Sequence, residues 1–322
     1  MSDDKVNIAF LMIPGFALTS FALAVEAFSV ANRLAATPAY APAFYHDGRD
    51  DGQQTVTSSN QVPVLTSHSF VRDEVDCSVV FICAYQGAAL YQYKPVLQKL
   101  NRLQRRGCRI AALTSGSFIL AKAGLMKHSS CTVVPEQQAV FHELYPETGL
   151  QENLFTVNGN ILTCAGGMSA LDMALYLIAL DHGSNFAACV SEQFLQERMR
   201  SEKETQRTSR YIRLRMKSAA LGAAVEVMEN NIEHPCSIAE LAVKIGTTPR
   251  TLENAFRRHE HTTPNAYYLK LRLGHAYRMI QETQLPLKVI AAATGFGSQS
   301  YFTKRFREVY GVQPGQLRTQ VI

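Results

Sequence analysis

Apolar and polar residues follow two different patterns along the chain. In the first 200 residues, continuous apolar runs typical of strands buried on both faces lie at residues 6–13, 77–83 and 108–113. Helical patterns lie at residues 19–34, 94–106 and 169–181, and a polar, turn-rich segment at 48–63. An Asn-Gly pair between two β-prone runs predicts a hairpin at residues 155–163. This order predicts an α/β domain built on a mostly parallel sheet.

The last hundred residues have a helical pattern that occurs twice. Residues 241–264 align with residues 290–314, and each copy predicts a short helix, a turn and a second helix. The turns contain Gly246 and Gly295, and the second helices follow the capping residues Thr248 and Ser298. The sequence therefore predicts an all-α domain with two helix-turn-helix units.

The second helix of each copy has an apolar face and a polar face. At helical spacing, Leu252 and Phe256 are expected to pack inward in one copy, and Phe302 and Phe306 in the other. The opposite stripes carry side chains of the kinds that read base edges in DNA: Arg250, Glu253, Asn254 and Arg257, then Ser300, Thr303, Lys304 and Arg307. Held by a shared helix at residues 267–281, these helices would enter major-groove segments roughly 34 Å apart. The alternative is a charged face that is only solvated, which the duplication of the stripe disfavours.

The net charge of +5 is distributed unevenly. Residues 201–322 contain 18 Lys and Arg against 10 Asp and Glu, whereas residues 1–200 contain 14 against 17. A basic module indicates a polyanionic partner, and with the polar stripes it favours double-stranded DNA. We therefore divide the chain into a first domain at residues 1–198, a charged linker at 199–217 whose basic end would contact phosphates, and a DNA-binding domain at 218–322.

Cysteine spacing and hydropathy restrict the chemistry further. The seven cysteines are scattered and never form a Cys-x-x-Cys pair, so we expect reduced thiols, with no disulfide framework, metal site or cofactor. An acidic N-terminus and the lack of a long apolar run predict a cytoplasmic protein without a membrane segment, associated with the nucleoid when bound to DNA.

Three segments of the C-terminal part carry a specific similarity: SIAELAVKIGTTPRTLENAF, TTPNAYYLKLRLGHA and GFGSQSYFTKRFREVYGVQPGQLR. They resemble the AraC/XylS family of bacterial transcription regulators. The resemblance implies base-reading positions at Arg250, Glu253 and Asn254, and on the second recognition helix at Gln299, Ser300, Thr303 and Lys304. The sequence departs from the family at His261, where a glycine usually ends the first recognition helix. Because a left-handed cap costs more for histidine than for glycine, we expect this helix to end differently.

Three segments of the first domain carry a second similarity: IPGFALTSFALAVEAFSVAN, ALTSGSFILAKAGLM and YPETGLQENLFTVNGNILTCAGGMSALDMAL. They resemble the PfpI-like, class I glutamine amidotransferase-like domain of GlxA-type regulators, which implies a flavodoxin-like fold. Enzymes of this superfamily use a cysteine on a strand-to-helix elbow, a histidine after it and often an acidic residue. The matching positions here hold Thr114, Val134 and Ser20, so we expect the domain to be catalytically inactive.

Two further observations concern the elbow. A β-branched residue such as Thr114 tolerates the strained backbone of an enzyme elbow poorly, which we take as a second sign of inactivity. Cys131 is the rival nucleophile, but its surroundings, SSCTVV, favour a buried strand thiol.

The elbow retains hydrogen-bond donors that could bind a small ligand. The N–H groups at the start of its helix, with the hydroxyls of Thr114, Ser115 and Ser117, would accept a small carboxylate. In an open parallel sheet a ligand lies at the carboxyl ends of the strands. We therefore expect the lining residues to be Phe16, Ser20, Tyr85, Gln86, Thr114 and Ser115. The alternative for the serines is that they only cap the helix.

Together these patterns predict a ligand-responsive, sequence-specific transcription regulator. The resemblance implies an activator of a catabolic operon that works with RNA polymerase, dimerises through its first domain and responds to a small nitrogen-containing effector such as an amino acid, betaine or carnitine-like compound. Two other classes remain open. One is a hydrolase or amidotransferase tethered to DNA, and the other is a first domain that only dimerises and binds no ligand.

Overall fold

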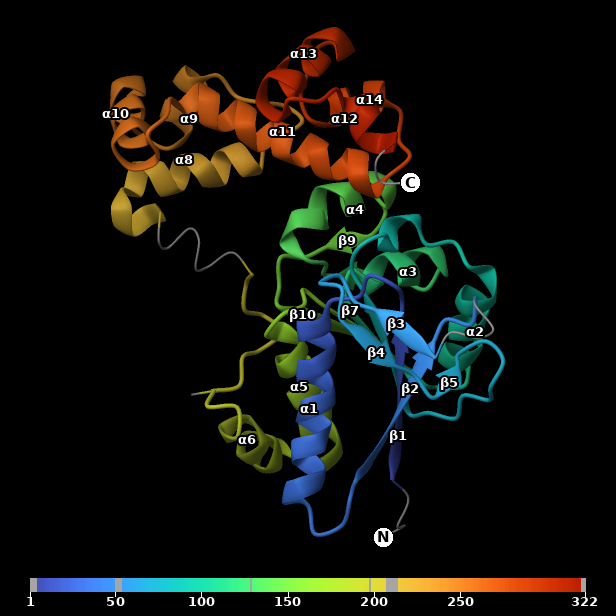
Figure 1. Ribbon diagram of the computed structural model, residues 1–322. Coiled ribbons are helices and arrows are strands. Elements are labelled where there is room, and N and C mark those ends of the chain that lie inside the picture. The colour runs from blue at the N-terminus through green and yellow to red at the C-terminus, as the bar shows by residue number, and fades with distance from the viewer. Residues whose placement is uncertain (1–4, 50–53, 128, 197, 207–213, 320–322) are drawn as a thin grey trace. The chain divides into compact units, whose positions relative to one another are not determined.

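The computed structural model describes residues 5–49, 54–127, 129–196, 198–206 and 214–319 (Figure 1). The chain divides into two compact units, residues 1–206 and residues 207–322. Within the described residues, no helix combines the length and the apolar character needed to cross a membrane.

The first unit is built on a seven-stranded sheet with the order β10-β11-β7-β6-β1-β2-β5. Its strands are β1 (Val6–Met12), β2 (Tyr40–His46), β5 (His68–Ser69), β6 (Val79–Ala84), β7 (Arg109–Thr114), β10 (Phe155–Asn158) and β11 (Ile161–Cys164). All neighbours pair in parallel except β10 and β11, which form the antiparallel hairpin that the Asn-Gly pair predicts. The prediction of an α/β domain with a mostly parallel sheet is confirmed.

Helices α1 (Leu18–Leu34), α5 (Ser169–His182) and α6 (Ser184–Glu192) pack on one another and on the sheet through a single apolar cluster. The alternate residues of β1 and β6 enter this cluster, as the period of a strand requires, and the rings of Phe10 and Phe81 stack there at 4.9 Å. Helix α2 (Lys94–Arg105) leads into β7, and α3 (Gly116–Lys122) follows it directly. The strand, the turn and the helix thus form the predicted elbow.

Short elements complete the unit. They are β3 (Thr55–Thr57) with β4 (Pro63–Leu65), β8 (Ser130–Cys131) with β9 (Gly149–Leu150), α4 (Gln138–Leu144), and the 3-10 turns η1 (Ala88–Leu90) and η2 (Pro135–Gln137).

The part of the expected linker before residue 207 lies against the first unit. We name residues 198–206 the strap. Two backbone hydrogen bonds hold the strap. Leu154 N donates to Glu204 O of the strap (2.7 Å), and Gln206 N of the strap donates to Glu152 O (2.8 Å). Residues 207–213, which contain much of the predicted basic end, lie outside the described residues.

The second unit is all-α, as predicted. Its helices are α8 (Ala219–Glu229), α9 (Ile238–Lys244), α10 (Pro249–Glu260), α11 (Pro264–Glu282), α12 (Leu287–Ala293), α13 (Gln299–Tyr310) and α14 (Pro314–Thr319). Helices α9 and α10 form one helix-turn-helix, α12 and α13 the other, and α11 is the shared helix between them (Figure 1). The caps are also confirmed, because the side chains of Thr248 and Ser298 accept hydrogen bonds from Thr251 N (3.2 Å) and Tyr301 N (3.3 Å).

Candidate DNA-binding surface and effector-binding region

Helices α10 and α13 separate their apolar and polar faces as the sequence predicts. Leu252, Phe256, Phe302 and Phe306 are fully buried. The expected base-reading residues are exposed, apart from the half-buried Thr303: Arg250, Glu253, Asn254, Arg257, Gln299, Ser300, Lys304 and Arg307. On α13, Ser300, Thr303, Lys304 and Arg307 line a surface hollow together with Glu308 and Gln313.

Arg272 holds the second helix-turn-helix on the shared helix α11. Its guanidinium donates hydrogen bonds from Nε to Thr294 O (2.8 Å) and from Nη2 to Gly295 O (2.6 Å), and it lies 4.3 Å from the centre of the Phe296 ring. The two carbonyls belong to the end of α12 and the turn before α13, so Arg272 fixes the position of α13. The sequence analysis missed this residue, since nothing local distinguishes it from the other basic residues of α11.

The turn glycines and the helix exits are left-handed in both copies. Gly246 has φ 68° and Gly295 has φ 74°, which explains glycine at both turns. His261 (φ 52°) and Gly311 (φ 75°) end the two recognition helices. Both exits use the left-handed region, in which His261 carries a conformational cost that Gly311 does not, and they differ in detail: ψ is 32° at His261 and -10° at Gly311, whose N–H donates to Arg307 O at 2.9 Å.

The elbow of the first unit brings together the three positions matched to catalytic residues. The hydroxyls of Ser20 and Thr114 lie 2.9 Å apart, and Val134 N donates a hydrogen bond to Thr114 O (3.3 Å). Thr114 has φ 59°, a left-handed backbone that is strained for a β-branched residue. The surrounding structure holds Thr114 in the strained conformation although threonine tolerates it poorly, so this conformation does not distinguish the elbow from that of an enzyme. Neither hydroxyl is a general base, which is one of the groups that activate a nucleophile in enzymes.

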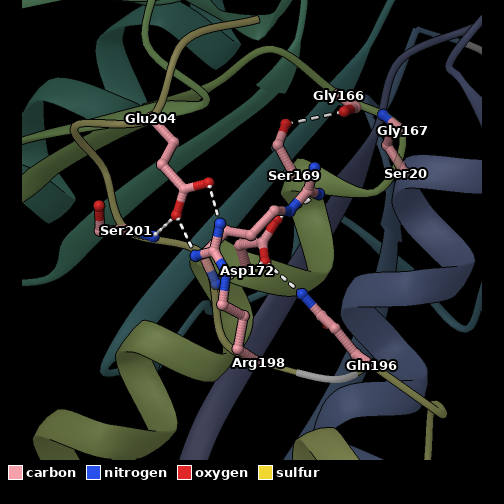
Figure 2. A network of polar contacts seen from close by, with 10 residues as sticks. Ser20, Gly166, Gly167, Ser169, Asp172, Gln196, Arg198, Ser201 and Glu204 are labelled. Atoms are coloured by element: carbon pink, nitrogen blue, oxygen red, sulfur yellow. Dashed lines mark hydrogen bonds and ion pairs between the residues drawn. The ribbon is translucent and has the colours of Figure 1, made fainter. Parts of the chain in front are cut away.

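The elbow is filled by the chain itself. Gly166 and Gly167 follow β11, and Gly167 N donates to Ser20 Oγ at 2.8 Å (Figure 2). A Cβ on Gly166 would collide with Thr114 Oγ1 and lie 3.1 Å from Ser20 Oγ. A side chain at this position would therefore displace the elbow hydroxyls.

The predicted lining residues are mostly inaccessible in this arrangement. Phe16, Ser20, Thr114 and Ser115 are at most 4% exposed. The hydroxyl of Ser115 donates to Gln137 Oε1, and that of Ser117 donates to Thr132 O, so neither side chain caps α3. Half-buried Tyr85 donates its hydroxyl to Glu136 Oε1 at 2.9 Å. Of the six residues, Gln86 alone contributes to the hollow described next.

A hollow of ≈ 630 Å³ opens beside the elbow, at the carboxyl ends of β1 and β6. It is lined by Ile13, Pro14, Arg49, Gln86, Gly87, Leu90, Tyr91, Gln92 and Tyr93. The Arg49 guanidinium lies 4.4 Å from the ring centre of Tyr91 and 5.4 Å from that of Tyr93, and its Nε is 3.1 Å from Asp47 Oδ2. Asp47 Oδ2 also accepts a hydrogen bond from the Tyr91 hydroxyl at 3.1 Å. These contacts fix the orientation of the Arg49 guanidinium, which forms part of the wall of the hollow.

Two thiols near the elbow are poorly suited to attack. Cys131 is completely buried, and burial raises the pKa of its thiol to about 12. Cys164, which the sequence analysis did not single out, ends β11 beside the elbow. Burial raises the pKa of Cys164 to about 11, although the N–H groups of Gly166 and Thr114 act in the opposite direction. Both groups are therefore protonated near neutral pH, and the thiolate is the nucleophile.

A polar network joins α5 to the strap (Figure 2). The side chain of Asp172, which is 0% exposed, accepts hydrogen bonds from Arg200 Nη2 (2.6 Å) and Gln196 Nε2 (2.8 Å). Arg198 binds Glu204 through two hydrogen bonds of 2.6 and 2.9 Å, and this contact lowers the pKa of Glu204 to about 2. Asp172 is thus a structural acid that anchors the strap.

The far end of the strap is tied to the loop that follows the elbow helix. Gln206 Nε2 donates hydrogen bonds to Asn153 O (2.6 Å) and to Thr132 Oγ1. Thr132 O in turn accepts the Ser117 hydroxyl of α3 at 2.7 Å. The Gln206 end of the strap is therefore linked to the elbow helix α3 through Thr132.

Comparison with known proteins agrees with both units. A helix-turn-helix domain family matches residues 241–320. The whole chain is 35% identical to the HTH-type transcriptional regulator GlxA of Rhizobium meliloti, covering 98% of each protein. It is 33% identical to the HTH-type transcriptional regulator GbdR of Pseudomonas aeruginosa, covering 97% of this chain and 84% of GbdR. The chain belongs to the AraC family of transcription regulators, GlxA type.

Solved structures show the fold of the first unit of this AraC-family regulator. An AraC family transcriptional regulator from Pseudomonas putida matches with a TM-score of 0.52 at 21% identity, covering 59% of this chain and 99% of that one. Drosophila melanogaster DJ-1beta matches with a TM-score of 0.51 at 20% identity, covering 60% of this chain and 100% of that one. The first unit therefore has the DJ-1/PfpI-like fold, and the protein as a whole is a DNA-binding transcription regulator.

Proposed function

We propose that this regulator reads an asymmetric promoter site with α10 and α13, and that a small effector bound by the first unit controls this binding. The observation that carries the proposal is the duplicated, exposed polar stripe on two capped helices whose apolar faces are fully buried. A merely solvated helix would not need the same stripe, turn and cap twice in one chain.

The side chains on the stripes suit base edges. Arg250 and Lys304 pair with guanine, Asn254 with adenine and Glu253 with cytosine, and each good pair discriminates by about 1–3 kcal/mol. Arg257 and Arg307 lie one turn further along their helices and reach either bases or phosphates. We propose all nine predicted residues, Gln299, Ser300 and Thr303 included, as the reading surface.

The test is a genome-wide map of DNA bound by the full-length protein in its own cells. An Asn254→Ala, Lys304→Ala variant removes one reading group from each helix. An Arg105→Ala variant is the matched control, because it removes one exposed positive charge from α2 of the first unit.

We expect a small set of sharp sites that the double variant loses and the control keeps. Sites unchanged in the double variant would refute the assignment of the stripes, and diffuse binding by the parent protein would refute sequence-specific reading. The operons beside the sharp sites would identify the pathway under control.

We propose that the effector carries a carboxylate and binds in the hollow beside Arg49. A guanidinium held over two aromatic rings binds carboxylates through paired hydrogen bonds, and the rings of Tyr91 and Tyr93 suit an apolar or cationic remainder. Burial and the neighbouring Asp47 raise the pKa of the Tyr91 phenol well above its usual range, so this hydroxyl remains a donor that positions Asp47 and Arg49. Amino acids, betaines and carnitine-like compounds have this combination of groups.

Thermal unfolding in the presence of such compounds tests the effector proposal. A ligand present at 100 times its dissociation constant stabilises the folded protein by roughly 2.7 kcal/mol. The shift should disappear in an Arg49→Met variant and persist in an Arg105→Met variant. If no compound of this class shifts unfolding, the first unit is better described as a dimerisation domain without a ligand.

We further propose that the elbow is catalytically inactive, that the protein forms homodimers through its first unit, and that it activates transcription with RNA polymerase. The support for inactivity is the pairing of Thr114 with Ser20, neither of which can accept the proton of an attacking hydroxyl. Dimerisation and activation rest on the sequence resemblance to GlxA-type regulators. Light scattering of the purified protein measures dimerisation. Transcription in vitro from a mapped promoter measures activation.

A further inference from the structure

Cys77 and Cys108 lie side by side at the amino ends of β6 and β7, at the opposite edge of the sheet from the elbow. Their sulfur atoms are 3.4 Å apart. A backbone hydrogen bond from Arg109 N to Ser78 O (2.9 Å) joins the residues next to them, so the two strand starts are held at ladder spacing. Neighbouring strands lie about 4.8 Å apart. In the register of β6 and β7, Cys77 lies one residue before the position opposite Cys108, so we place their Cα atoms about 6 Å apart, which is within the separation that a disulfide spans.

We propose that Cys77 and Cys108 are a peroxide-sensitive dithiol that closes to a reversible disulfide. Cys77 is half-buried and Cys108 is 5% exposed, so a small oxidant reaches the pair from the Cys77 side. Closure needs the two sulfur atoms to approach by a small rotation of the side chains, because the backbone already has the required spacing.

The electrostatics assign a role to each sulfur. The hydrogen bond between the two thiols lowers the pKa of the Cys108 thiol, and Val80 N and Arg109 act in the same direction against the effect of burial. The same hydrogen bond raises the pKa of Cys77, and burial adds to the rise. Because Val80 N and Arg109 favour a negative charge on Cys108 independently of the bond between the two thiols, we take Cys108 as the attacking thiolate and Cys77 as the resolving thiol.

The reaction balances with hydrogen peroxide as the oxidant. The Cys108 thiolate attacks one peroxide oxygen, the O–O bond breaks, and the products are the Cys108 sulfenic acid and hydroxide. The Cys77 sulfur then attacks the sulfenic sulfur. The S–S bond forms, the S–O bond breaks, and the Cys77 proton leaves with the hydroxyl group as water. Two thiols have lost two electrons and two protons, and a thiol reductant reverses the change.

The other cysteines provide internal controls. Cys83 on β6 and Cys164 on β11 are fully buried, but β7 lies between their strands, so they are too far apart to bridge. Cys189 is exposed and Cys236 half-buried, and both belong to other parts of the chain. Replacing Cys189 and Cys236 by serine leaves five of the seven thiols and removes the accessible competitors.

The experiment treats the full-length Cys189→Ser, Cys236→Ser protein with hydrogen peroxide, removes the peroxide, unfolds the protein in denaturant and alkylates the remaining thiols, which include the buried Cys83, Cys131 and Cys164. The protein is then digested without reduction. We expect alkylated thiols to fall from five to three, a cross-linked peptide joining residues 77 and 108, and full recovery after dithiothreitol. In a further Cys77→Ser variant, dimedone should trap the sulfenic acid at Cys108, whereas Cys108→Ser should leave Cys77 unmodified.

Two outcomes would overturn the proposal. One is complete alkylation of Cys77 and Cys108 after peroxide treatment that oxidises Cys189 in the parent protein. The other is a cross-link that joins different cysteines. Neither outcome depends on DNA or effector binding, so the result is independent of the proposed function.

Discussion

Gly295 and Gly246 occupy matching turns of the two helix-turn-helix units, and their replacement by alanine separates backbone strain from packing. Both residues are left-handed, so alanine costs about 1–2 kcal/mol at either site. A Cβ on Gly246 meets nothing within 4 Å. A Cβ on Gly295 would lie 2.6 Å from Ile232 O and 2.9 Å from Glu233 O, in the loop after α8.

The contacts at Gly295 are with two backbone carbonyls and with Cδ of the Pro235 ring (2.7 Å), none of which can rotate away as a flexible side chain can. Overpacking of this kind typically costs about 1–3 kcal/mol. We therefore expect Gly295→Ala to destabilise the second unit by about 2–5 kcal/mol and Gly246→Ala by about 1–2 kcal/mol. The shift of the turn also disturbs the hydrogen bonds from Arg272, so Gly295→Ala should weaken DNA binding more than Gly246→Ala.

Hydrogen exchange followed by mass spectrometry measures this in the full-length protein, because peptides from α11 to α13 report on the second unit separately from the first. The difference between the variants should appear as a difference in opening free energy of about 1–3 kcal/mol. Equal losses in the two variants, or a larger loss for Gly246→Ala, would show that the contact of Gly295 with the α8–α9 loop does not restrict this position.

Three further predictions follow from single contacts. His261→Gly removes the cost of a left-handed histidine and should stabilise the second unit by about 1 kcal/mol in urea unfolding, whereas a neutral or negative effect would mean that the His261 side chain contributes an offsetting interaction. Asp172→Ala should destabilise the first unit by about 2–4 kcal/mol because it leaves the half-buried Arg200 unpaired, and Arg200→Met should cost at least as much because it leaves the fully buried Asp172 carboxylate without its cation. Glu204 has a pKa lowered from 4.5 to about 2, so its pairing stabilises the fold above about pH 4.5 and is lost as the pH falls toward about 2. The protection factors of the strap amides, which are corrected for the intrinsic pH dependence of exchange, should fall across that window in the parent protein and change less there in Glu204→Gln.

The recognition helices could be predicted almost completely because their features are local. The helical spacing of Leu252 and Phe256 identifies the buried face, and the capping residue Thr248 identifies the helix start. The sheet of the first unit is similarly predictable, since continuous apolar runs separated by helical segments permit few arrangements other than a parallel sheet. The hairpin at Asn158–Gly159 follows from its turn residues alone.

The candidate effector region was less predictable. Sequence similarity brings Ser20, Thr114 and Val134 together correctly, but it does not show that Gly166 closes the elbow over their hydroxyls. The hollow lies instead beside Arg49, a residue with no local pattern to distinguish it from other surface arginines. Burial of a polar side chain depends on which distant segment covers it, and hydrophobic periodicity does not encode that.

The sequence by itself determined the repeated helix-turn-helix pattern, the charge asymmetry and the presence of threonine at the tip of the elbow, because each depends on residue identity and short-range spacing. The tertiary structure decided the strain at Thr114, the anchoring of the strap by Asp172 and Gln206, and the meeting of Cys77 with Cys108. These features join residues up to 94 positions apart, as Ser20 and Thr114 are. Such contacts form only when the sheet order and the packing of the helices bring the segments together, and no local rule specifies that order.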